Sequence, residues 1–211
     1  MIYSCANTVT LPENKPTQDK TYSFKWNNPE ILKKSSYNWK TIPESLRKNH
    51  LQYTEWLVQE IKASGLDRLT PSDGKEFGLL STSDAVEFWG NILVEVSFWE
   101  SGWDTKNAYT ESFGDSRGVN VVSRGLFQIS VESGNNRKRS DCRLTDYKQL
   151  HDAHINIWCS ARIIAYFVRT DGVISKKTVT GWKGPARYFS VLRGTRDYTA
   201  KALGAIKNAN N

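Results

Sequence analysis

The stretch FWESG, Phe98 to Gly102, ends the longest apolar run of helical spacing in the sequence. The side chains of Ser81 to Asp84 can accept bonds from the free N–H groups of a first helical turn, so they predict a helix start there. Gly102 is placed to end that helix. At helical spacing four apolar residues share one face: Val86, Trp89, Leu93 and Val96. Glu100 continues this face, one helical repeat after Val96.

Glu100 is predicted to be an unusual acid, because it continues a buried face at the C-terminal end of a helix. Burial disfavours the charged carboxylate, and so does the negative end of the helix dipole, so both raise its pKa. A raised pKa suits a general acid that works near neutral pH. In the alternative interpretation Glu100 caps the face and reaches water where the helix ends. The stretch by itself leaves both open.

The bulk composition predicts one globular domain with an extension. The chain has 211 residues, of which 38% are hydrophobic and 24% are charged. A net charge of +7 favours polyanionic partners such as nucleic acid, anionic lipid or an acidic cell wall, although a charge that only promotes solubility is as common. No stretch approaches the roughly 20 apolar residues of a membrane span, and the start of the chain has no apolar signal region. We expect an N-terminal extension over residues 1–40 and a domain over 41–211.

The pattern of elements predicts an α+β fold that is mainly α with a small β element. Four aromatic residues of the extension are expected to pin it to the domain: Phe24, Trp26, Tyr37 and Trp39. Besides the helix ending at Gly102, we expect helices from a Thr41 cap to Gly65, from 146 to 168 behind a Thr145 cap, over 186–192 and over 198–209. Strand signals are weak, over 118–122 and 125–129.

The cysteines and histidines do not predict a metal site. Cys142 and Cys159 can pair by their positions, and Cys5 is either a free thiol or, in a natural precursor, a lipid-anchor cysteine. No Cys/His ligand spacing is present, so zinc is not expected. His151 and His154 lie three residues apart on a predicted helix without a third ligand, and we interpret them as surface or hydrogen-bonded histidines.

Three short motifs in order resemble those of the soluble lytic transglycosylases and goose-type lysozymes. They are Glu100-Ser101, then SRGLFQ over Ser123 to Gln128, then DAHINI over Asp152 to Ile157. The family's fourth motif, Tyr-Asn-x-Gly, is degenerate here, and either Trp182 or Tyr188 replaces its tyrosine. The resemblance covers about residues 84–192 and leaves the first 40 residues outside.

This resemblance implies a lysozyme-like α+β fold with a sugar-binding cleft. It implies cleavage of the β-1,4 bond between N-acetylmuramic acid and N-acetylglucosamine in peptidoglycan, by a monomer exported to the periplasm or beyond, without a cofactor. Glu100 takes the place of the catalytic glutamate. The resemblance implies substrate-binding or supporting roles for Ser101, Ser123, Gln128, Asn156, Trp182 and Tyr188.

The reaction type depends on whether a second carboxylate faces Glu100. An inverting hydrolase needs one to activate water. A lytic transglycosylase does not, because the 6-hydroxyl of its substrate attacks and gives a 1,6-anhydro product. Glu111 and Asp115 are the candidates, and the acid-rich loop slightly favours a hydrolase. On a wall that lacks acetyl groups, whose amino sugars are cationic, these acids could serve recognition instead.

Two other function classes remain open at this point. One is a wall-binding module that keeps the fold without activity, against which the intact Glu100 argues. The other is a nucleic-acid binder, suggested by the basic balance and by Arg137 to Arg139. Because the sequence has no aromatic-basic motif for nucleic acid, we interpret that tripeptide as a solvated turn and expect no nucleic-acid partner.

Overall fold

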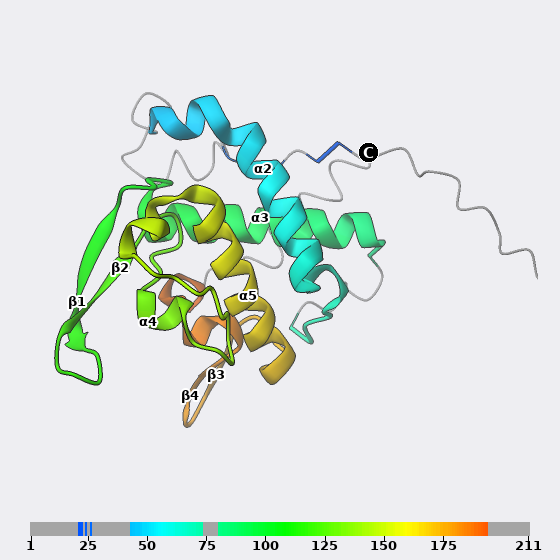
Figure 1. Cartoon of the computed structure of the whole chain (residues 1–211). Coiled ribbons are helices and arrows are strands. Elements are labelled where there is room, and N and C mark those ends of the chain that lie inside the picture. Colours follow the sequence, from blue (N-terminus) through cyan, green and yellow to red (C-terminus); the bar gives the residue numbers. More distant parts are fainter. Residues whose placement is uncertain (1–20, 23, 25, 27–42, 74–79, 194–211) are drawn as a thin grey trace, which may run out of the picture.

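The structure is a computed structural model, and it describes residues 21, 22, 24, 26, 43–73 and 80–193 (Figure 1). It is a mixed α+β fold, mainly helical, with two small antiparallel hairpins. The fold class is therefore as predicted. Several predicted features lie outside the described residues: Cys5, Tyr37, Trp39 and the helix over 198–209.

Helix α3 (Thr82–Ser101) lies at the centre of the molecule (Figure 1). Its predicted ends are confirmed. The Ser81 side chain accepts a bond from the N–H of Asp84, and Gly102 closes the helix in the left-handed conformation with φ 64°. Every residue from Ala85 to Phe98 is buried. The buried surface is therefore wider than the single predicted face, and the helix leaves the core only in its first and last turns.

Helix α2 (Glu44–Ser64) packs against both α3 and α5 (Ala153–Asp171). The predicted end of α2 at Gly65 is confirmed, but its N-cap is Pro43, not Thr41. Proline suits the edge of a helix because it lacks an N–H that would need a partner, and no side chain caps this end.

The helix predicted from 146 to 168 is confirmed over residues 153–168, but its first part is wrong because the chain breaks at Asp152. A 3-10 helix, η3 (Tyr147–His151), precedes α5, and Asp152 between them is extended with φ −78° and ψ 123°. The Asp152 carboxylate accepts a bond from the N–H of Ile155, and Asp146 rather than Thr145 caps η3. Two aspartates each start a new helix here, which periodicity alone does not reveal.

The two hairpins are β1 (Ala108–Gly114) with β2 (Asn120–Arg124) and β3 (Lys176–Thr178) with β4 (Gly181–Lys183). The strand predicted over 118–122 overlaps β2, but β1, β3 and β4 were not expected. The strand predicted over 125–129 is wrong, since these residues form a tight turn closed by a bridge between Arg124 and Ile129.

The remaining described helices are short: η1 (Leu66–Arg68), α4 (Val131–Gly134), η4 (Gly184–Arg187) and η5 (Ser190–Leu192). The helix predicted over 186–192 is thus two 3-10 turns.

The N-terminal aromatics Phe24 and Trp26 are buried in the core. Trp26 Nε1 donates to Thr54 Oγ1 of α2 at 2.9 Å. The Phe24 ring lies against Gly90 of α3, where an added Cβ would come within 2.2 Å of the ring. The predicted pinning is confirmed for these two residues, so the core of the helical part includes side chains from before residue 40.

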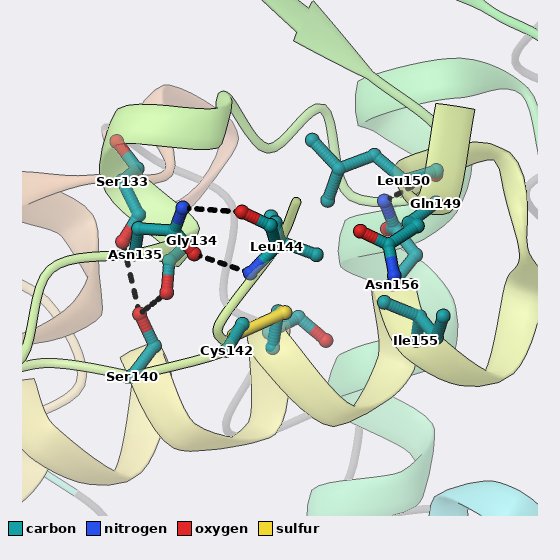
Figure 2. Close-up of a disulfide and its surroundings, with 12 residues drawn as sticks. Ser133, Gly134, Asn135, Ser140, Cys142, Leu144, Gln149, Leu150, Ile155 and Asn156 are labelled. Atoms are coloured by element: carbon teal, nitrogen blue, oxygen red, sulfur yellow. Dashed lines mark hydrogen bonds between the residues drawn. A yellow bond between two sulfur atoms is a disulfide. The ribbon is translucent and has the colours of Figure 1, made fainter. Parts of the chain in front are cut away.

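A disulfide joins Cys142 to Cys159, which lie 5.8 Å apart at Cα (Figure 2). It ties the loop before η3 to α5. His151 Nδ1 bonds the Thr105 carbonyl, and His154 Nε2 lies 3.3 Å from Glu60 Oε1, so both histidines are hydrogen-bonded as predicted. Among the described residues, no His, Cys, Asp and Glu cluster could hold a metal, and no helix is long and apolar enough to cross a membrane.

Candidate active site

A cleft of about 670 Å³ lies where the C-terminal end of α3, the β1–β2 hairpin, α4 and the η4–η5 segment come together. Six of the nine residues singled out in the sequence line it: Glu100, Glu111, Asp115, Ser123, Gln128 and Tyr188. They come from four separate parts of the chain, so the tertiary fold assembles the site.

Glu100 lies in the last turn of α3, at the point where that helix leaves the core and meets the cleft. Its pKa is raised from 4.5 to about 7, mostly by burial and also by the negative charge of Glu111, while the positive charge of Arg193 lowers it. Near neutral pH a large fraction of Glu100 is therefore protonated and able to donate its proton.

Glu111 enters the cleft from β1 and is held there by a neighbouring strand. Ser123 Oγ on β2 donates to Glu111 Oε1 at 2.7 Å. The pairing register of β1 and β2 shifts between Thr110 and Gly114, and Glu111 lies inside that irregular stretch. Strand irregularities of this kind re-aim side chains near functional sites. The result is an oriented carboxylate close enough to Glu100 to affect its pKa.

The Gly125 to Gln128 turn forms the floor between α3 and β2, and its backbone geometry explains its sequence. Gly125 has φ 74°, and a Cβ there would lie 2.1 Å from the Leu150 carbonyl oxygen. Gln128 also has a left-handed φ, of 46°, and its Nε2 donates to the Gly125 carbonyl at 2.8 Å. Gln128 thus closes its own turn as well as lining the cleft.

Three of the nine residues do not line the cleft. Asn156 is fully buried in α5, where its Oδ1 accepts from the Phe127 N–H at 2.8 Å and its Nδ2 donates to the Arg124 and Leu150 carbonyls. Ser101 Oγ donates to the Leu126 carbonyl. Asn156 and Ser101 therefore hold the turn from behind. Trp182 is half-buried on β4 and packs against the core.

Asp115 lines the cleft from the β1–β2 turn, but its carboxylate is already engaged. It accepts bonds from the Arg117 side chain and from the N–H groups of Arg117 and Val119. The hydrogen bond from the Arg117 side chain lowers the pKa of Asp115. This aspartate is a stable anion committed to its own turn.

Tyr188 lies between η4 and η5 and lines the cleft. Burial raises its pKa to about 12. It is hydrogen-bonded to the Ser133 side chain and the Ser130 backbone, and the charge of Glu100 also acts on it. Of the two residues considered for the fourth motif, the structure thus places Tyr188 beside Glu100 in the cleft and Trp182 outside it.

Several other residues of the cleft were not predicted from the sequence. Arg193 lines it, and its guanidinium is held by the Ala186 and Arg187 carbonyls. Phe113 presents a largely exposed ring on the same strand face as Glu111, and Glu132 comes from α4. Phe113 follows from the two-residue period of β1, but that strand was not predicted.

Comparison with solved structures finds chains that share this fold. A wild-type form of DslA (Bd0314), a Bdellovibrio protein, has 32% sequence identity and a TM-score of 0.67, with 76% of this chain and 90% of that chain covered. The chain belongs to the DslA family. No family model matches the sequence, and no curated protein matches it.

Two further DslA structures carry single glutamate-to-glutamine substitutions. One has 31% identity and a TM-score of 0.68, with 81% of this chain and 97% of that chain covered. The other has 32% identity and a TM-score of 0.67. The two substituted glutamates of DslA are eleven residues apart.

Proposed function

We propose that this protein is a peptidoglycan-cleaving glycosidase, a muramidase of lysozyme-like fold, in which Glu100 is the general acid. The observation that carries the proposal is a glutamate with a pKa of about 7 in a cleft that a second carboxylate, Glu111, also lines. Glycoside cleavage needs an acid that protonates the leaving oxygen and a carboxylate that assists the oxocarbenium-like sugar.

The spacing of the two glutamates supports the proposal. Glu100 and Glu111 are eleven residues apart, the same separation as the two substituted glutamates of DslA. The order of Glu100-Ser101, the SRGLFQ turn and the Asn156 helix start also agrees with the resemblance to lytic transglycosylases and goose-type lysozymes. In this chain Asn156 and Ser101 serve as supports for the turn rather than as sugar contacts.

We assign Glu111 the role of the second carboxylate, which favours a hydrolase over a transglycosylase. The Ser123 hydroxyl orients it, whereas Asp115 is bound by its own turn and by Arg117. In the hydrolase, Glu100 gives its proton to the glycosidic oxygen as the bond breaks. Glu111 takes a proton from the attacking water, and proton exchange with the solvent then returns Glu111 to its carboxylate form and Glu100 to its acid form.

The decisive experiment is digestion of purified peptidoglycan, native and chemically deacetylated, with the products identified by mass spectrometry. A hydrolase gives reducing muramic acid ends. Products that carry 1,6-anhydro ends throughout would replace the hydrolase by the transglycosylase, in which Glu111 is dispensable.

One variant tests the role assigned to Glu100, and a second serves as its control. Glu100→Gln should lower the rate by roughly 10²–10⁴-fold, since this is what a positioned general acid contributes. Glu55→Gln is the matched control, because Glu55 is an exposed glutamate of α2 that does not line the cleft. If Glu100→Gln keeps its lytic activity, the protein is instead a wall-binding module, or its acid is another residue.

A further inference from the structure

A second, smaller cavity of about 280 Å³ is lined by basic side chains and shares no residue with the cleft. It lies between the C-terminal end of α2, the loop that follows α4, and α5. We call it the basic pocket and define it by five cationic residues: Arg137, Lys138, Arg139, Arg162 and Arg169.

The charge in the basic pocket is not balanced by the protein. Asp141 also lines it, but its carboxylate lies 3.4 Å from Arg143, outside the five. Among the described residues, none of the five cations makes an ion pair. Arg169 donates to the Ser64 carbonyl at the end of α2, as basic side chains often do at helix C-termini. The pocket therefore holds a concentrated positive potential.

Arg162 is the residue of the basic pocket that most directly indicates a ligand. Its Nε is buried, and no described group accepts a hydrogen bond from it. Its guanidinium lies over the Trp158 ring, 5.0 Å from the centroid, and this contact fixes the plane of the fork. A buried charged donor without an acceptor among the described residues is costly, which favours an acceptor that arrives from outside.

The loop that carries three of the cations is held in place before any ligand binds. Ser140 Oγ donates to the Ser133 and Gly134 carbonyls (Figure 2). The Asn136 side chain accepts from the N–H groups of Lys138 and Arg139. The disulfide joins Cys142 of this loop to Cys159 of α5 (Figure 2). Cys159 lies three residues before Arg162. A preformed site loses little conformational freedom on binding.

We propose that the basic pocket binds a phosphate group. Guanidinium forks match phosphate oxygens in a bidentate geometry, and a cluster of four arginines and one lysine around a small hollow fits a compact terminal phosphate. An extended nucleic-acid backbone would need a groove rather than a pocket. This proposal is independent of the glycosidase function and stands or falls separately from it.

Titration calorimetry at low ionic strength tests the proposal, with inorganic phosphate, glucose 6-phosphate and a short DNA duplex as probes. We expect saturable one-to-one binding of phosphate that weakens as salt is added. Tighter binding of the sugar phosphate would identify a phosphorylated glycan as the source, and equal binding would identify free phosphate. Either result supports the pocket.

Three variants locate the binding. Arg162→Gln should weaken phosphate binding at least about tenfold, since hydrogen bonds to charged groups are individually strong. The exposed pair Arg137→Ala and Lys138→Ala, combined, should weaken it severalfold without loss of the fold. Lys177→Ala removes an exposed charge from β3 outside the pocket and should leave binding unchanged.

The proposal is overturned if phosphate does not saturate, or if Lys177→Ala weakens it as much as the pocket variants do. It is also overturned if only the DNA duplex binds and Arg162→Gln leaves that binding intact.

Discussion

Glu100 keeps its proton in the folded protein over a pH range in which an unfolded glutamate loses it. Its pKa is about 7 in the fold against an ordinary 4.5. The folded state therefore binds more protons between these values, so the free energy of unfolding falls as pH rises through that window. The total loss is at most about 3 kcal/mol.

Glu100→Gln should remove this dependence. The variant and the wild type should be similarly stable near pH 4, and the variant should be more stable by up to about 3 kcal/mol at pH 8. Denaturant titrations at several pH values measure the difference. Parallel curves for the two proteins would mean that Glu100 titrates normally.

Arg193 opposes the two effects that raise the pKa of Glu100. Arg193→Gln removes a positive charge that favours the carboxylate, so the pKa of Glu100 should rise. If protonated Glu100 is the acid, the alkaline limb of the pH–rate profile should move to higher pH. Arg187→Gln is the matched control, because Arg187 also lines the cleft but pairs with Asp171. An unmoved limb in Arg193→Gln, or an equal shift in both, would contradict the assignment.

At the scale of elements, glycine substitutions test how tightly the Gly125 turn packs against α3, β2 and α5. Gly125 and Gly118 both have positive φ, but only Gly125 has neighbours within reach of a Cβ. Gly118→Ala should cost about 1 kcal/mol for the left-handed backbone alone. Gly125→Ala should cost about 3 kcal/mol or more, because the Leu150 carbonyl and the Asn156 side chain must also move. Denaturant unfolding compares the two, and equal costs would refute the packing argument.

At the scale of the whole molecule, the N-terminal aromatics belong to the cooperative core. Trp26 is 2% exposed, contacts the rings of Tyr53 and Trp103, and bonds Thr54. Trp26→Ala should lower the free energy of unfolding by about 3–5 kcal/mol. Leu51→Ala, at an exposed apolar position of α2, should change it by less than about 0.5 kcal/mol. If thermal unfolding shows that Trp26→Ala is as stable as Leu51→Ala, the N-terminal segment packs without contributing to the core.

The three long helices follow from local features. The side chain of Ser81 caps the start of α3. Three glycines end the helices in the left-handed conformation: Gly65, Gly102 and Gly172. Apolar spacing identified the core positions between them. The break at Asp152 was missed because it involves a contact distant in sequence, the bond that His151 makes to Thr105. The β1–β2 hairpin was missed because its first strand has no alternation of buried and exposed residues, since six of the seven residues of β1 are exposed.

The sequence by itself determined the place of Glu100, in the last turn of a long buried helix that Gly102 ends, and the motifs after it mark the turn that supports this helix end. Only the tertiary structure decided which residues share the cleft. It joined Glu111 to Ser123 across two strands, engaged Asp115 with Arg117, and moved Asn156 behind the turn. It also brought Arg162 to the basic loop. The physical reason is that helix ends depend on a few neighbouring residues, whereas the environment of a carboxylate depends on every chain segment that folds around it.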